Sequence, residues 1–345
     1  MELADLAHWT PIRLVLLPPE PAIDWCDLRG VRFEEPFFDQ TVARWAARPV
    51  VRTTLQELAA LDGEPSLDPA GFIFHMSRCG STVVSRLLST LPGMVVATEP
   101  GPINSLLEAD PKLIHDEGRI AVLRLLIRAL GRIRAGDETR YVVKLSSWNV
   151  RLLPLFRAAF PGTPLVWIHR RPAEVMASIL AGPPGWMQLR KHPRIAEYLF
   201  GLDPSAVPAM APEEFCARVL ASMIEAWVAA ADETALQIDY GDLPGAVWDR
   251  VAPFVGAIPG AADLGRMAEE ARYYAKDPAK QIFAGATRTI GDSIDAMAHR
   301  LVDPVYRRMV AAGKVGGFHA NAARTPQSCH VDLKNRGFTR SGNLP

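Results

Sequence analysis

The stretch that most constrains how this chain can fold is residues 71–91, with the sequence GFIFHMSRCGSTVVSRLLSTL. It begins with an apolar run and continues into a short turn that contains one glycine, Gly80. Apolar residues then recur at positions i, i+3, i+4 and i+7, the spacing of one helix face; they are Val84, Leu87, Leu88 and Leu91. The pattern predicts a strand, a loop and a helix, in that order.

The loop in this stretch has the chemistry of an anion site. A loop that enters a helix presents backbone N–H groups at the helix N-terminus, where the helix dipole also favours negative charge. Arg78, Ser81 and Thr82 add a guanidinium and two hydroxyls. The ATPase pattern needs G-x-x-x-x-G-K-[ST], whereas His75 stands at its first glycine and no lysine follows Gly80. We expect a phosphate site of another kind, or else a buried strand and a serine-capped helix without a ligand.

A second candidate anion site begins at the end of another apolar run, residues 163–169. Arg170 follows that run, and Pro172 favours the start of a helix that carries Ser178. In doubly wound sheets, ligands bind at the carboxyl ends of the strands. The two arginine-containing turns are therefore expected at the same sheet edge, unless Pro172 merely begins a helix beside a surface arginine.

Both turns resemble the donor-binding motifs of sulfotransferases. The segment R-C-G-S-T at residues 78–82 resembles their phosphosulfate loop, K/R-S-G-T/S-T, and is most similar to the arginine-containing form of tyrosylprotein and many bacterial sulfotransferases. Residues 170–178 resemble the 3′-phosphate motif R-[N/D]-P-x-[D/E]-V-x-x-S, although Arg171 departs from it; the matches are Arg170, Pro172, Glu174, Val175 and Ser178. The resemblance covers about residues 71–260.

The resemblance implies that the donor is 3′-phosphoadenosine-5′-phosphosulfate (PAPS) and that the product is adenosine 3′,5′-bisphosphate (PAP). One nucleotide with phosphate-like groups at both ends explains two separate anion sites. The residues implied to hold it are Arg78, Cys79, Gly80, Ser81, Thr82, Arg170, Ser178 and Tyr240. Val83 stands where cytosolic sulfotransferases have a tryptophan that stacks on adenine, and Trp148 or Trp186 could replace it.

The resemblance also implies a catalytic set without a metal. Arg78 and Lys144 are expected to stabilise the leaving 5′-phosphate and the sulfuryl oxygens, since such group transfer depends on positioning and electrostatics. Glu99 stands where tyrosylprotein and several bacterial sulfotransferases have their general base. Cytosolic sulfotransferases use a histidine instead, so His75 and His169, near the same edge, stay open as alternatives.

Strand-like and helix-like segments alternate through most of the chain. Strands are predicted at residues 94–98, 140–145, 163–169 and 235–240, and helices at 117–133, 148–160, 212–232, 243–255 and 302–312, the last with Gly313 as its C-cap. Such alternation implies right-handed crossovers and a parallel sheet. We therefore predict an α/β protein with a central parallel sheet flanked by helices, a P-loop nucleotide-binding, sulfotransferase-like fold. Residues 71–320 are predicted to form this domain.

Outside that domain, residues 1–70 are predicted to pack on the core as an extension, and residues 321–345 to form a tail. Residues 313–318 faintly resemble the loop that covers the 3′-phosphate in the family, without its basic pair. The basic row Arg124, Arg128 and Arg132 is predicted to be a solvated helix face.

The composition limits the partners. A formal net charge of zero argues against nucleic acid or an anionic membrane as the main partner. The four cysteines are far apart and form neither a zinc motif nor a disulfide framework, which favours a cytoplasmic location. No apolar run is long enough to span a membrane. The oligomeric state stays open.

The acceptor is expected to be a hydroxyl of a small molecule, a glycan or a peptide, bound by loops in residues 100–118, 182–212 and 270–295. Two other functions remain open on the sequence: a P-loop kinase that uses ATP and magnesium, and a non-catalytic nucleotide-binding protein.

Overall fold

A computed structural model describes residues 3–16, 20–232, 235–273, 275, 281 and 289–315. Its centre is a five-stranded sheet in the order β5-β6-β4-β7-β8, in which every neighbouring pair is parallel. The strands are β4 (Pro69–His75), β5 (Met94–Thr98), β6 (Arg140–Lys144), β7 (Leu165–His169) and β8 (Leu236–Asp239). The predicted strands and the predicted α/β class with a helix-flanked parallel sheet are confirmed.

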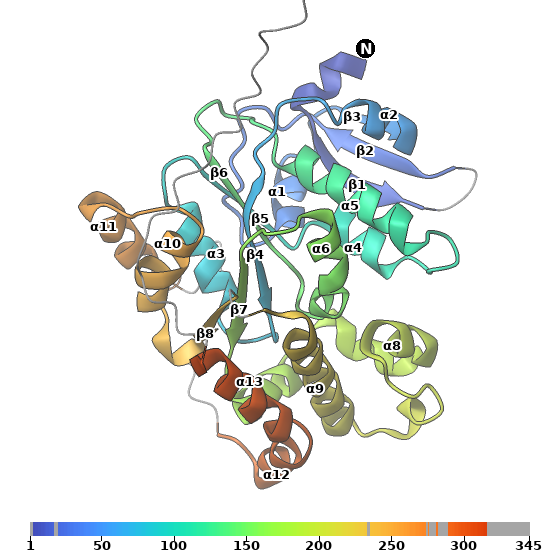
Figure 1. Cartoon of the computed structure of the whole chain (residues 1–345), viewed down its shortest axis with the longest axis vertical. Coiled ribbons are helices and arrows are strands. Elements are labelled where there is room, and N and C mark those ends of the chain that lie inside the picture. The colour runs from blue at the N-terminus through green and yellow to red at the C-terminus, as the bar shows by residue number, and fades with distance from the viewer. Residues whose placement is uncertain are drawn as a thin grey trace, which may run out of the picture.

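The helices cover both faces of this sheet (Figure 1). The α-helices are α1 (Phe38–Arg44), α2 (Leu55–Ala60), α3 (Ser81–Ser89), α4 (Gly101–Glu108), α5 (Asp116–Leu130), α6 (Leu153–Ala159), α7 (Pro172–Ala181), α8 (Pro193–Phe200), α9 (Pro212–Ala230), α10 (Ala252–Phe254), α11 (Ala261–Glu270), α12 (Asp292–Leu301) and α13 (Asp303–Val315). Short 3-10 helices are η1 (Leu3–His8), η2 (Ser147–Leu152), η3 (Gly185–Lys191), η4 (Val207–Ala209) and η5 (Tyr240–Asp242), and η6 (Val247–Val251) is a π-helix.

Aromatic side chains on one face of the sheet form the centre of the core. Phe72 packs edge-on against Phe156 of α6, with ring centroids 5.4 Å apart. Trp167 of β7 stacks on Trp227 of α9 at 5.1 Å, and both tryptophans are fully buried. Because strand residues alternate between faces, β4 and β7 direct their other residues toward the side on which α3 lies.

Strand order places a ligand site at the end of β4. After β4 the chain passes to β5 and β6 on one side, and then crosses to β7 and β8 on the other. At such a reversal the connections leave the central strand in opposite directions, which opens a crevice at the carboxyl ends of the strands. The loop that follows His75 lies at this position.

The amino-terminal extension contains structure that the sequence did not reveal. It forms an antiparallel sheet of β1 (Thr10–Val15), β2 (Ala22–Cys26) and β3 (Val50–Thr54). Strand β1 packs on α4 and α5.

Three expectations about local structure are corrected. Arg132 is not solvated: it lies beyond the end of α5, is 3% exposed, and donates to the carbonyls of Leu6 and Leu61 at 3.0 Å. Gly313 is not a C-cap, because α13 continues through it to Val315. The predicted helix over residues 148–160 is divided into η2 and α6.

The predicted tail, residues 321–345, and residues 316–318 lie outside the described residues. In the part of the chain that the structure describes, no helix is both long and apolar enough to cross a membrane.

Candidate active site

One pocket of about 1010 Å³ brings the two arginine-containing turns together. It lies at the carboxyl ends of the strands, and the segments that follow all five of them contribute lining residues. The ten residues that the resemblance assigned to the donor or to catalysis, apart from the alternative histidines, line it: Arg78, Cys79, Gly80, Ser81, Thr82, Glu99, Lys144, Arg170, Ser178 and Tyr240. Each of the three segments expected to hold the acceptor also contributes lining residues, among them Glu108, Trp186 and Tyr273.

The loop between β4 and α3 is held in an unusual backbone conformation. Ser77 and Arg78 have φ values of 71° and 46°, and Gly80 has φ 85°. Residues other than glycine rarely adopt positive φ, and such strain is common at functional sites. A Cβ on Gly80 would lie 2.6 Å from Leu243 and 2.9 Å from Tyr240, so no larger residue fits there.

Beyond the loop, Ser81 and Thr82 occupy the first turn of α3, where N–H groups have no partner within the helix. The Arg78 guanidinium donates to the carbonyl of Gly182, which ties the loop to the segment after α7. Cys79 faces inward: its thiol donates to the carbonyl of Ile168 at 3.1 Å, and burial raises its pKa to about 12. The side chain of Cys79 is therefore structural, and its backbone contributes to the loop.

The second turn directs a cation into the same pocket. Arg170 is held by Glu174 four residues later, at 2.7 Å, and its guanidinium carbon lies 4.0 Å from the ring centroid of Tyr240. Only 15% of the Arg170 side chain is exposed. Ser178 lines the pocket two turns into α7. This end of the pocket thus combines a partly buried guanidinium, a hydroxyl and an aromatic ring.

A charged cluster lies at the ends of β5 and β6. Lys144 is 1% exposed, and its ammonium pairs directly with the carboxylate of Glu99, which is 25% exposed. Ser146 donates to the other Glu99 oxygen at 3.2 Å. Glu99 has φ 52°, while its N–H donates to the carbonyl of Lys144 at 2.7 Å. The backbone and the side chains together fix this carboxylate at the pocket wall.

His75 lines the pocket, but both of its ring nitrogens are engaged. Nδ1 accepts the N–H of Ser77 at 3.1 Å, so Nε2 carries the proton and donates to the carbonyl of Leu145 at 3.0 Å. That proton also faces Glu99, whose Oε1 lies 3.8 Å from Nε2. Both ring nitrogens of His75 thus have hydrogen-bond partners in the described structure.

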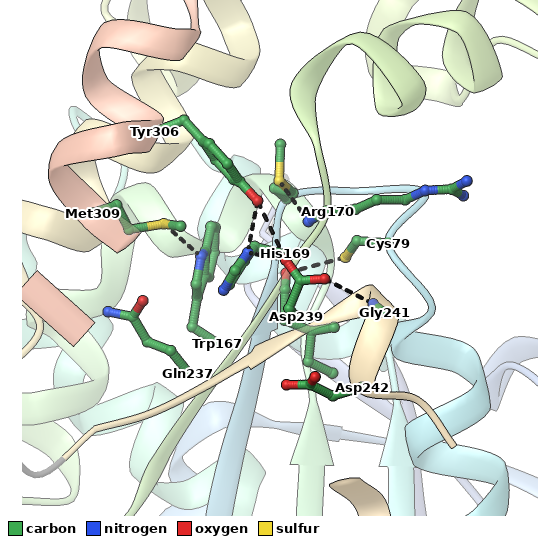
Figure 2. Close-up of polar contacts among 12 residues, drawn as sticks. Cys79, Trp167, His169, Arg170, Gln237, Asp239, Gly241, Asp242, Tyr306 and Met309 are labelled. Carbon is green, nitrogen blue, oxygen red and sulfur yellow. Dashed lines mark hydrogen bonds and ion pairs between the residues drawn. The ribbon is translucent and has the colours of Figure 1, made fainter. Parts of the chain in front are cut away.

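His169 is wrong as a candidate base. It is absent from the described residues that line the pocket. Its Nδ1 lies 3.0 Å from the hydroxyl of Tyr306 and 3.4 Å from Asp239 Oδ2, on the far side of the sheet edge from Arg170 (Figure 2). Alternation along β7 explains this, because His169 and Arg170 are successive residues that point to opposite faces.

The end of the pocket away from Arg170 is apolar. Its walls come from η2, η3 and α8, and the side chains are Trp148, Trp186, Leu189, Ile195 and Leu199. Glu108, the last residue of α4, also lines the pocket, and burial raises its pKa. Among the described residues Glu108 has no ion-pair or hydrogen-bond partner, so no described cation neutralises it.

Phe37 of the amino-terminal extension is a lining residue that the sequence analysis missed. Its ring centroid lies 5.5 Å from the ammonium of Lys144, a cation–π distance. Asp39, two residues later, accepts the N–H of Gly101 and lies near Glu99; burial and the charge of Glu99 raise its pKa. No local pattern marks either residue, because both come to the site through packing of the extension.

No family model and no curated protein matches this chain. Solved structures similar to it include a sulfotransferase from Mycobacterium avium (14% identity, TM-score 0.41, covering 74% of this chain and 78% of that one). Another is a sulfotransferase from Alicyclobacillus acidocaldarius (14%, 0.41, 72% and 96%). A mouse sulfotransferase complexed with PAP is also similar (13%, 0.37, 75% and 90%). These similar structures are all sulfotransferases. Each TM-score is below 0.5, so the similarities do not establish an activity for this chain.

Proposed function

We propose that this protein is a PAPS-dependent sulfotransferase that transfers a sulfuryl group to a hydroxyl acceptor. The observation that carries the proposal is the shared pocket of the two arginine-containing turns, residues 78–82 and Arg170 with Ser178. A donor with anionic groups at both ends needs two such sites, whereas ATP needs only the first. The motif resemblance of both turns supports the same donor.

The nucleotide lies with one end in each turn. The N–H groups at the start of α3, together with Ser81 and Thr82, hold the 5′-phosphosulfate, as helix N-termini do for other anions. Arg170 and Ser178 hold the 3′-phosphate, and Tyr240 contacts the adenine. Glu174 keeps the guanidinium of Arg170 in place before the donor binds. Such preorganisation reduces the entropy lost on binding.

Glu99 is the general base. It takes the proton of the acceptor hydroxyl as the acceptor oxygen forms a bond to sulfur and the bond between sulfur and the bridging 5′-phosphate oxygen breaks. The electron pair of that bond stays on the phosphate of PAP. Arg78 and Lys144 stabilise the negative charge that develops there and on the sulfuryl oxygens. Phe37, Ser146 and His75 hold the Glu99–Lys144 pair at the pocket wall.

The acceptor enters from the apolar end of the pocket. Tryptophan, leucine and isoleucine side chains form its walls, and Glu108 is the carboxylate besides Glu99 among the described lining residues. Apolar walls favour an aromatic or aliphatic alcohol over a glycan, whose many hydroxyls need polar partners. The carboxylate of Glu108 disfavours anionic acceptors, because like charges repel each other. The proposed acceptor is therefore a small apolar alcohol or phenol without a negative charge.

Ligand-dependent thermal stability tests the proposal. A ligand that binds only the folded chain stabilises it by about 2.7 kcal/mol at a hundred times its Kd, so PAP should raise the melting temperature by several degrees. Stabilisation by ATP with magnesium but not by PAP would indicate a kinase. PAP binding without transfer from radiolabelled PAPS to a panel of phenols, alcohols, sugars and tyrosine peptides would indicate a non-catalytic protein.

A cytoplasmic location stays a prediction.

A further inference from the structure

Helix α13 contacts the end of the sheet next to the proposed 3′-phosphate site. Its residues Tyr306, Met309 and Gly313 recur at i, i+3 and i+7, so they share one face. Met309 sulfur accepts the indole N–H of Trp167 at 3.0 Å. A Cβ on Gly313 would lie 2.5 Å from the side chain of Gln237, so the glycine permits this close approach. Figure 2 shows the helix above β7 and β8.

Tyr306 makes the contact closest to the pocket. Its hydroxyl lies 3.0 Å from His169 Nδ1 and 3.5 Å from Asp239 Oδ2. His169 and Asp239 are partners in register and are the last residues of β7 and β8. One hydroxyl therefore joins the carboxyl ends of two neighbouring strands.

The next residues along these two strands are those of the proposed nucleotide site. Arg170 follows His169, Tyr240 follows Asp239, and the guanidinium of the first stacks on the ring of the second. Asp239 also fixes the turn that carries Tyr240, because its Oδ1 accepts the N–H of Gly241 at 2.7 Å. In Figure 2 the Arg170 side chain extends away from Tyr306, so α13 does not itself reach the pocket there.

Strand β8 needs this support because of its position. It is a four-residue edge strand, hydrogen-bonded to β7 on one side only. An edge strand is held by half the backbone hydrogen bonds of an inner strand, so its end is the part of the sheet most easily displaced. Tyr306 and Asp239 connect that end to a helix and to β7 at once.

We propose that Tyr306 is a positioning residue for donor binding: through His169 and Asp239 it fixes the stacked pair Arg170 and Tyr240 at the 3′-phosphate end of the pocket. The proposal rests on the proposed function. It concerns a residue that touches neither substrate, and it predicts that α13 influences affinity for the nucleotide without taking part in the chemical step.

The test compares PAP with adenosine 5′-monophosphate (AMP), which lacks the 3′-phosphate, by calorimetry on the full chain. Tyr306→Phe keeps the ring, whose centroid lies 5.6 Å from that of His169, and removes only the hydroxyl. PAP affinity should fall about three- to tenfold, the effect of one lost hydrogen bond. AMP keeps the adenine contact with Tyr240 but has no 3′-phosphate for Arg170, so its affinity should fall by a clearly smaller factor. A general loss of structure would weaken both nucleotides equally, and that result would overturn the proposal, as would an unchanged PAP affinity.

Two further variants make the result specific. In an Arg170→Ala background, Tyr306→Phe should have no additional effect on PAP, because the two residues act as a unit. Tyr141→Phe is the matched control: its buried hydroxyl has no hydrogen-bond partner among the described residues, so PAP affinity should stay unchanged.

If the Tyr306→Phe variant does not fold, the Asp239→Asn variant tests the proposal in its place. The asparagine can still accept the N–H of Gly241, but the substitution removes the charged acceptor of the Tyr306 hydroxyl. An unchanged ratio of PAP affinity to AMP affinity in this variant would overturn the proposal. The wild-type chain separates the two ideas. Failure of the wild type to bind PAP refutes the proposed function, and this inference with it, whereas equal PAP binding by the wild type and Tyr306→Phe refutes the inference alone.

Discussion

Glu99 and Lys144 pair directly across the carboxyl ends of the neighbouring strands β5 and β6, and the ammonium of this pair is almost completely buried. Glu99 reaches that partner with its backbone in the left-handed region. Ser77 and Arg78 share this conformation, and these three are the described non-glycine residues with positive φ. All three line the same pocket. Backbone strain that is confined to one pocket supports a functional role for it.

Replacing Glu99 by glutamine should remove the base and spare the donor site. We expect kcat to fall by about 10² to 10⁴, the usual contribution of a general base, with PAP affinity unchanged. Because Lys144 then loses its counter-charge, the melting temperature should also be measured. Glu108→Gln, which removes the other carboxylate among the described lining residues, is the control and should keep its turnover with a neutral phenol. Full activity in Glu99→Gln would instead favour His75.

Arg170→Ala should weaken PAP by about 1.5–3 kcal/mol, the cost of losing a hydrogen bond to a charged group. The neighbouring Arg171 provides a matched control. Its side chain is 61% exposed, pairs with Asp295 and does not line the pocket in the described structure. Calorimetry should therefore show normal PAP binding in Arg171→Ala. Equal affinities in the two variants would argue against a 3′-phosphate site at Arg170.

Gly80→Ala should combine backbone strain with a clash. The strain alone is measured by Gly136→Ala, since Gly136 has φ 93° with no atom within 4 Å of its would-be Cβ; that variant should lose about 1–2 kcal/mol of unfolding free energy. Gly80→Ala has the same strain and must also displace Tyr240 and Leu243. It should lose more stability in urea unfolding and should also lose PAP binding. A Gly80 variant as mild as the Gly136 variant would contradict this packing.

The apolar end of the pocket is tested by adding a charge. Ile195 lies on α8 at the pocket and is 44% exposed, so Ile195→Glu should fold. The new carboxylate should raise KM for 1-naphthol at least several-fold and leave KM for PAPS unchanged, because a buried or half-buried charge near an apolar acceptor is costly. Ile258→Glu, at a position 89% exposed and away from the pocket, is the control. An unchanged KM for 1-naphthol would place the acceptor elsewhere.

The lowered pKa of His169 predicts how the free energy of unfolding depends on pH. Burial lowers its pKa below the ordinary value of 6.5, so as pH falls the unfolded chain takes up this proton before the folded chain does. Its contribution to stability is therefore complete above about pH 6.5 and decreases below it. Urea unfolding at about pH 7.5 and about pH 5.5 should show a larger loss in the wild type than in His169→Gln. Equal losses would mean that His169 protonates without hindrance in the folded state.

Local sequence was sufficient for the parts of the site that lie on single strand–turn–helix units. The glycine-containing turn before α3 and the arginine before Pro172 are determined by residues within about ten positions of one another. Strand alternation then predicted a parallel sheet, and parallel strands direct such turns to one edge. For this reason the sequence alone predicts that residues as distant as Arg78, Lys144 and Tyr240 line a common pocket.

Contacts between distant segments were not accessible in this way. Phe37 approaches Lys144 only because the antiparallel sheet of the extension packs on α4, and Tyr306 reaches His169 across 137 residues. Arg132 illustrates the same limit: its spacing is that of a solvated helix face, yet the helix ends before it and the extension covers it. Gly313 resembled a helix end, but α13 continues through it, and a Cβ there would meet the side-chain amide of Gln237.

The sequence by itself therefore determined the strands, the two arginine-containing turns and the sheet edge at which they meet, because hydrophobic period and turn chemistry act over a few residues. The tertiary structure decided which histidine faces the pocket, which aromatic residue covers the Glu99–Lys144 pair and which helix supports the edge strand. Those choices depend on how whole layers pack, and packing energy is shared among residues that no local pattern relates.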